Sequence, residues 1–96
     1  MLKHIVCFKI KEEFKHRIEE AKNTLLSMEG NVPMLKKIIV GVDFLHSERS
    51  YDLILETWFE SVEDLNNYQI DPYHVNVIKK LMHEIRESSI AIDYFE

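Results

Sequence analysis

The sequence contains few of the residues that crosslink or interrupt a chain: its 96 residues include one cysteine, two glycines and two prolines. Because Cys7 is alone, no disulfide can form within the chain, and a reducing compartment is the simplest setting. The shortage of glycine and proline, together with 46 % hydrophobic residues, excludes a collagen-like or disordered chain. We therefore expect a globular protein, and the length predicts a single domain over residues 1–96.

Positive charge is also in short supply, since 17 Asp and Glu outnumber 12 Lys and Arg and leave a net charge of -5. Nucleic acids and anionic membranes are bound through cationic surfaces, so we expect neither as a partner. No apolar run approaches the length of a membrane span, and the opening MLKHIVCFKI lacks the uninterrupted apolar core of a signal peptide. These absences predict a soluble cytoplasmic protein.

The pattern of apolar residues predicts the secondary structure. Residues 2–10 alternate as a strand does, and one face of that strand carries Leu2, His4, Val6, Phe8 and Ile10. Residues 12–29 show the spacing of an amphipathic helix, which Gly30 is expected to stop. Residues 36–44 and 51–60 are rich in β-branched and aromatic residues and predict a hairpin, and residues 88–96 predict a fourth strand.

Two further helices are predicted between the third and fourth strands. Ser61 is a suitable N-cap for a short helix that begins at SVEDL, and Asp71 is a suitable cap for the next helix, with Pro72 in its first turn. Beyond this bend an apolar stripe follows helical spacing. Its members are His74, Ile78, Leu81 and Ile85. We therefore expect His74 to lie at the start of a buried helical face.

The order strand, helix, strand, strand, helix pair, strand predicts an α+β fold of the ferredoxin-like (split βαβ) type. In this fold a four-stranded antiparallel sheet has its helices on one face. The other face is also apolar, with Ile5, Cys7, Ile39, Ile54 and Trp58. Because a lone copy would expose this face, we predict a homodimer in which two sheets pack together through these residues. Trp58 is the expected anchor of that interface.

The chain resembles the stress-responsive α/β-barrel (Dabb) family over almost its whole length. The resemblance rests on KHIVCFKIKEE, VPMLKKIIVGVDF, YDLILETWFESVEDLNNYQIDPYHV and the closing IDYF, in that order. It implies a ferredoxin-like domain that forms a dimeric α/β barrel. Most of the family has no known activity, so the resemblance is more informative about fold than about function.

One branch of that family, the plant polyketide cyclases, closes a poly-β-keto chain by an aldol step without cofactor or metal, using a tyrosine and a histidine together. The resemblance places that pair on Tyr68 and His74, and two further matching residues on His4 and Asp93. The chain departs from the pattern at Asp71-Pro72, where the family often has His-Pro. It also has Leu53 where the cyclase has a histidine, which implies a more apolar pocket.

Three functions remain open from the sequence. The first is binding of a small, largely apolar organic molecule between sheet and helices, without a cofactor or a metal. The residues expected to line that site are His4, Val6, Phe8, Leu53, Leu55 and Asp93. The second is a cofactor-independent cyclase or isomerase, in which His74 takes a proton from carbon and the hydroxyl of Tyr68 stabilises the enolate. The third is a purely structural dimer whose interior is filled by its own large side chains.

Overall fold

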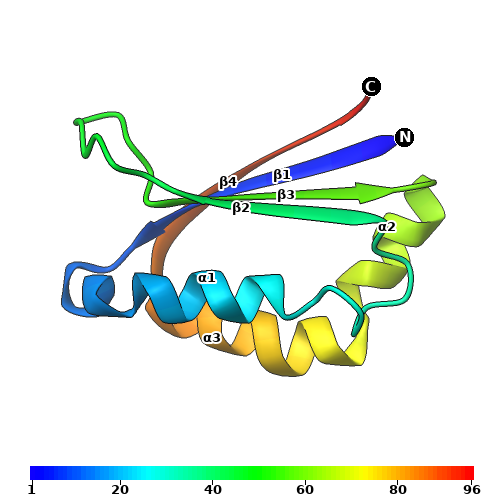
Figure 1. Cartoon of the computed structure of the whole chain (residues 1–96), viewed down its shortest axis with the longest axis horizontal. Coiled ribbons are helices and arrows are strands. Elements are labelled where there is room, and N and C mark those ends of the chain that lie inside the picture. The colour runs from blue at the N-terminus through cyan, green and yellow to red at the C-terminus, as the bar shows by residue number, and fades with distance from the viewer.

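Four antiparallel strands form one sheet in the order β2-β3-β1-β4, and the helices cover one face of it (Figure 1). The computed structural model describes residues Met1–Glu96. The strands are β1 (Leu2–Ile10), β2 (Lys37–Val42), β3 (Leu53–Phe59) and β4 (Arg86–Phe95). The two ends of the chain lie at the same end of the sheet. This arrangement confirms the predicted split βαβ topology.

The helical segments are η1 (Glu12–Arg17), α1 (Ile18–Leu26), α2 (Val62–Gln69), η2 (His74–Lys79) and α3 (Lys80–Ile85). The prediction of one helix over residues 12–29 was therefore wrong in detail. Its first six residues form a 3₁₀ helix, and no side chain caps that start. The α-helical part ends at Leu26, and Gly30, with φ of 85°, lies in the turns that follow. None of the helices is long and apolar enough to cross a bilayer.

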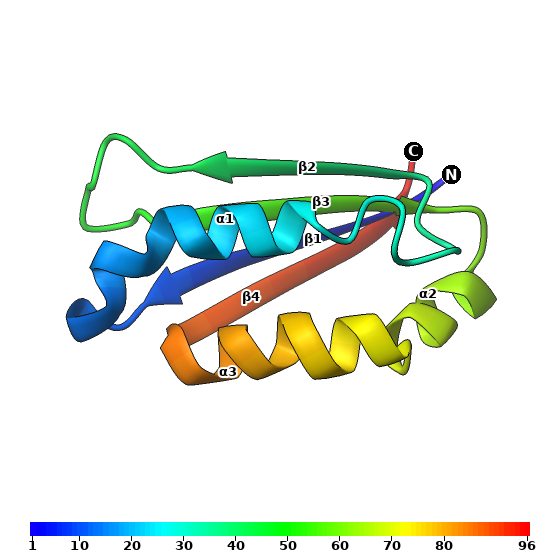
Figure 2. The ribbon, with the colours of Figure 1, turned by 60° about the horizontal axis from the view of Figure 1, so that its bottom comes forward.

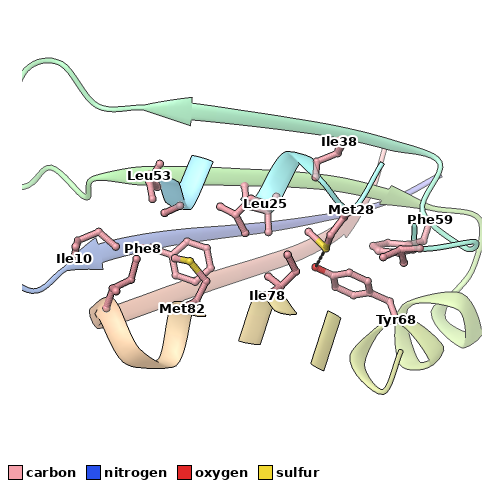
Figure 3. Packing of buried hydrophobic residues seen from close by; sticks show 14 residues of the cluster. Phe8, Ile10, Leu25, Met28, Ile38, Leu53, Phe59, Tyr68, Ile78 and Met82 are labelled. Atoms are coloured by element: carbon pink, nitrogen blue, oxygen red, sulfur yellow. Dashed lines mark hydrogen bonds between the residues drawn. The ribbon is translucent and has the colours of Figure 1, made fainter. Parts of the chain in front are cut away.

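Helices α1 and α3 lie on the same face of the sheet but cover different strands. In Figure 2, α1 lies along β2 and β3, whereas α3 runs on the side of β1 and β4. The predicted alternation in β1 is confirmed, because Leu2, His4, Phe8 and Ile10 are buried on the helix-covered face. Facing them in the core are apolar side chains from the helices and from the turn after α1, among them Leu25, Met28, Ile78 and Met82 (Figure 3). The main core therefore lies between the sheet and the helices.

The segment that begins at His74 is wider than the predicted α-helix. Residues His74–Lys79 form a π-helix, with i→i+5 hydrogen bonds, before the chain continues as α3. Met82, four residues after Ile78, is buried, Leu81 is half-buried and packs against the core, and Ile85 is buried as predicted. The prediction therefore holds for Ile78 and Ile85, whereas Met82, which shares that face, was not predicted. Such π segments occur frequently at functional sites.

The sheet face that bears no helices, called the outer face below, carries the residues predicted for it. The strand register places Ile5, Cys7, Ile39, Ile54 and Trp58 there, and β4 adds Ile90, Ile92 and Tyr94. Ile92 is 60 % exposed, but Trp58 is only 8 % exposed. The ammonium groups of Lys3 and Lys37 lie 4.8 and 4.9 Å from the Trp58 ring, and its indole N–H donates to Glu96. Its own chain therefore covers most of the Trp58 ring, and the role of Trp58 as anchor of the interface stays a prediction.

Candidate functional site

A cavity of about 240 Å³ lies between the sheet and the helices, on the side of β1 and β4. From the strands it is lined by His4, Val6, Phe8, Leu55, Arg86, Ser89 and Ala91. From the helices it is lined by Tyr68, Gln69, His74, Ile78, Lys79, Met82 and His83. Half of these 14 residues are hydrophobic, and none is acidic. The cavity brings together three of the four residues that the family resemblance singles out.

The bend between α2 and η2 is held by two side-chain caps, both as predicted. The Asp64 N–H donates to the Ser61 hydroxyl at 3.1 Å, which fixes the start of α2. The backbone N–H groups of Tyr73 and His74 donate to one carboxylate oxygen of Asp71, at 2.9 and 3.1 Å. These caps fix the chain on both sides of the bend and so position the two rings that point from it.

The rings of Tyr68 and His74 stack on each other. Their centroids are 3.9 Å apart, and their planes are inclined by 14°. The Nδ1 atom of His74 lies 2.9 Å from the carbonyl oxygen of Tyr68. Because a carbonyl oxygen can only accept, Nδ1 must carry the proton, which leaves the lone pair of a neutral imidazole on Nε2. The backbone therefore selects the tautomer of His74.

Burial lowers the pKa of His74 to about 4, because the charged ring would lose water at this position. The hydrogen bond to the Tyr68 carbonyl acts in the opposite direction and raises the pKa. The positive charge of Lys79 lowers the pKa further, Asp71 raises it, and His4 lowers it slightly. His74 is consequently neutral at physiological pH, and its Nε2 is able to accept a proton or a hydrogen bond.

The hydroxyl of Tyr68 does not point toward the imidazole of His74. It donates to the sulfur of Met28 at 3.7 Å, inside the core (Figure 3). The side chain is 1 % exposed, and burial raises the pKa of its phenol well above the ordinary value. The expectation that the Tyr68 hydroxyl and the His74 base face one substrate is therefore not met in this arrangement, although the Tyr68 ring does line the cavity.

A second imidazole borders the same cavity from the sheet. His4 is buried on β1, and its Nδ1 is hydrogen-bonded to a carboxylate oxygen of Asp93, its neighbour on β4. The ring of His4 meets the ring of Tyr68 edge to face, with centroids 6.1 Å apart. Tyr68 thus contacts an imidazole on either side. These contacts bring His4, Asp93, Tyr68 and His74 together in one cluster.

Of the predicted ligand-binding residues, Leu53, like Asp93, does not line this cavity. It is buried in the core and borders a different hollow of about 450 Å³, where β2 and β3 approach their connecting loop. Asp93 reaches the cavity only through His4. The sequence analysis missed a set of polar lining residues, namely Gln69, Lys79, His83, Arg86 and Ser89. The spacing of Lys79, His83 and Arg86 at i, i+4 and i+7 was the available signal.

Comparison with known proteins gives consistent matches. The family model described as Stress Responsive A/B Barrel Domain matches residues 2–96. Olivetolic acid cyclase from Cannabis sativa is 34 % identical over 77 residues, which cover 77 % of this chain and 76 % of the cyclase.

Two solved structures show the same fold. A dimeric ferredoxin-like protein of unknown function from Bacteroides fragilis is 27 % identical, with a TM-score of 0.86 and coverage of 99 % of this chain and 95 % of that one. Hydroxynitrile lyase from Passiflora edulis is 19 % identical, with a TM-score of 0.83 and coverage of 97 % and 90 %. Because the identity to the lyase is low, that likeness concerns the fold alone.

Proposed function

Since this chain belongs to the stress responsive A/B barrel domain family, we propose that it acts as one domain that binds a small organic molecule in the cavity beside Tyr68 and His74. The observation that carries this proposal is the cavity itself. Half of its lining is hydrophobic, and two of its three imidazoles are held in place, one by the Tyr68 carbonyl and the other by Asp93. Few, well-oriented polar groups in an apolar lining are typical of ligand sites.

The size of the cavity limits the ligand. A volume of about 240 Å³ corresponds to roughly eight water molecules at about 30 Å³ each. It lies just below the range of about 300–1,000 Å³ that is usual for drug-sized ligands. The open space also argues against an interior filled entirely by the protein's own side chains. We therefore expect a molecule of one ring or one short chain, in contact with Phe8, Leu55 and Ile78.

Binding is tested by NMR with an isotope-labelled protein and a panel of one-ring and short-chain organic molecules. A binding function predicts shifts in the ring signals of His74 and His4 that saturate with concentration. Val6→Trp, which adds bulk to the cavity wall, should abolish them, whereas Val62→Trp, at an exposed position of α2, should not. If no member of the panel moves these signals at millimolar concentration, a purely structural role becomes the better account.

We also propose that two copies associate through the outer face. The exposed side chains of Ile90, Ile92 and Tyr94, which form an apolar strip along β4, and of Ile39 on β2 support this proposal. The Bacteroides fragilis protein, with the same fold, is described as dimeric. Association of two such faces would remove the strip from water in a closed, two-fold contact.

A second candidate function is a cofactor-independent cyclase or isomerase. It is favoured by the similarity to olivetolic acid cyclase and by the tautomer of His74. A neutral imidazole with its lone pair on Nε2 can remove a proton from carbon next to a carbonyl group. Nδ1 would meanwhile keep its hydrogen bond to the Tyr68 carbonyl, which stabilises the imidazolium that forms. For Tyr68 to donate to the enolate, its hydroxyl must first leave Met28.

The cyclase candidate is tested by turnover of a short β-keto thioester. His74→Gln keeps a donor for the Tyr68 carbonyl but removes the base, so it should abolish turnover while binding persists. Tyr68→Phe then decides the role of the hydroxyl. A fall in kcat at constant KM shows that the hydroxyl turns toward the substrate. Unchanged kcat shows that the hydroxyl stays with Met28 throughout.

A further inference from the structure

The cavity carries a row of basic side chains that no acidic side chain neutralises. Lys79 and His83 lie at i and i+4 on η2 and α3, and Arg86 is the first residue of β4, directly after that helix ends. Each of these basic residues comes directly after a residue of the buried row, whose members are Ile78, Met82 and Ile85. The basic row therefore flanks the buried row over the length of η2 and α3.

Neither Lys79 nor Arg86 forms an ion pair. Lys79 donates to the backbone carbonyl of Gln69 at 2.9 Å, and Arg86 donates to the hydroxyl of Ser89 at 2.7 Å. Both partners are neutral, and both cations are only partly exposed. In a chain with 17 acidic residues and a net charge of -5, two cations without a carboxylate in one cavity are unexpected.

Three acidic side chains near this row, in the fold or in the sequence, are already engaged. Asp93 is bound to His4, and Asp71 accepts two backbone N–H groups at the bend. Glu84, which lies between His83 and Arg86 in sequence, pairs with Arg17 on the other side of the helix at 2.7 Å. Glu87, next to Arg86, borders a separate hollow together with Lys9 and Lys15. Because Lys79 and Arg86 form no ion pair within the chain, an anion from outside can neutralise them.

We propose that the ligand of this cavity is an amphipathic organic acid, a class narrower than the molecule given under the proposed function, on which this inference rests. Its carboxylate is bound at the rim by the Lys79 ammonium and the Arg86 guanidinium. The guanidinium has five N–H donors, so it can bind a carboxylate while one of them stays with Ser89. The apolar part of the acid lies against Phe8, Leu55 and Ile78.

The same geometry couples the ligand to His74. The charge of Lys79 opposes protonation of His74, and a carboxylate bound to Lys79 would offset that charge. Binding of the acid is therefore expected to raise the pKa of His74, and binding of an uncharged analogue is not. This shift gives a second readout that is independent of affinity.

The test compares 3-phenylpropionate with 3-phenylpropionamide, which differ in charge but hardly in shape. Calorimetry at pH 7.5 and low salt should show the acid binding at least about tenfold more tightly, the factor that corresponds to about 1.4 kcal/mol. Raising the ionic strength should weaken binding of the acid but not binding of the amide. Arg86→Gln and Lys79→Gln should each reduce the preference, and Lys80→Gln, at an exposed position next to Lys79, should leave it unchanged.

The outcomes separate this inference from the proposed function. The inference is supported if the protein prefers the acid, if Arg86→Gln or Lys79→Gln removes that preference, and if the acid raises the pKa of His74. Equal binding of acid and amide overturns the acid specificity but leaves the binding cavity intact. Absence of binding by either molecule, at millimolar concentration, overturns both.

Discussion

Acidification should destabilise this protein through His74. The pKa of this ring is lowered from 6.5 to about 4 in the folded protein, chiefly because burial disfavours its charge. Between these two values the unfolded chain binds a proton that the folded chain does not, so stability rises with pH. The stability that the neutral His74 ring contributes is fully present above about pH 6.5 and is lost as pH falls toward 4. Lys79 and His4 oppose protonation of the ring, and Asp71 favours it.

The two pKa values set the size of the effect. One pKa unit corresponds to about 1.4 kcal/mol, so the whole gap corresponds to about 3 kcal/mol. Between pH 7.5 and pH 4.5 the calculated loss is about 2.5 kcal/mol. The ring lines a cavity that admits solvent, and solvent screens part of the charge, so we expect about 1–2 kcal/mol in practice.

Urea unfolding at a fixed protein concentration measures this loss, with the fluorescence of Trp58, the single tryptophan, as the signal. His74→Gln retains a donor for the Tyr68 carbonyl but does not titrate in this range. The stability difference between wild type and His74→Gln should change by about 1–2 kcal/mol between pH 7.5 and 4.5. His83→Gln, at an exposed position, serves as the control. Equal losses in wild type and His74→Gln would refute the reasoning, since acid would then act through other groups.

Three further outcomes are expected. Asp71→Ala removes the acceptor of two N–H groups, so it should cost about 1–2 kcal/mol and lower the thermal midpoint by several degrees in circular dichroism; an unchanged midpoint would contradict the capping role. Ile92→Asp places a charge on the outer face and should yield monomers in sedimentation at micromolar concentration, while Val62→Asp on α2 should not; a persistent dimer would reject this face as the contact. Tyr68→Phe removes only the weak contact with Met28, so it should cost less than about 1 kcal/mol in urea unfolding, and a larger cost would show that the hydroxyl has a stronger partner.

Much of the candidate site was readable from short-range patterns. Alternation in residues 2–10 placed His4 on the helix-covered face, and the capping residues Ser61 and Asp71 fixed both sides of the bend. These signals are local, because a cap acts within one helical turn and a strand alternates with period two. The resemblance to the family then brought Asp93 into the same site.

The π-helix was not readable from such patterns. Periodicity alone assumes a constant number of residues per turn, and it did not single out Met82, which is buried beside the half-buried Leu81. Similarly, the sequence does not show that the hydroxyl of Tyr68 ends at the sulfur of Met28, 40 positions earlier in the chain. Contacts of this kind depend on how α1 and α2 pack over the same sheet.

The sequence by itself determined the order of strands and helices, the apolar character of both sheet faces and the family, because these follow from local periodicity and from motifs in fixed order. The tertiary structure alone decided which outer-face residues are exposed. Lys3 and Lys37, on neighbouring strands, cover Trp58 and leave Ile92 bare. It also decided that Lys79 and Arg86 border a cavity without an acid. The physical reason is that exposure and charge pairing depend on segments distant in sequence, which only the folded chain brings into contact.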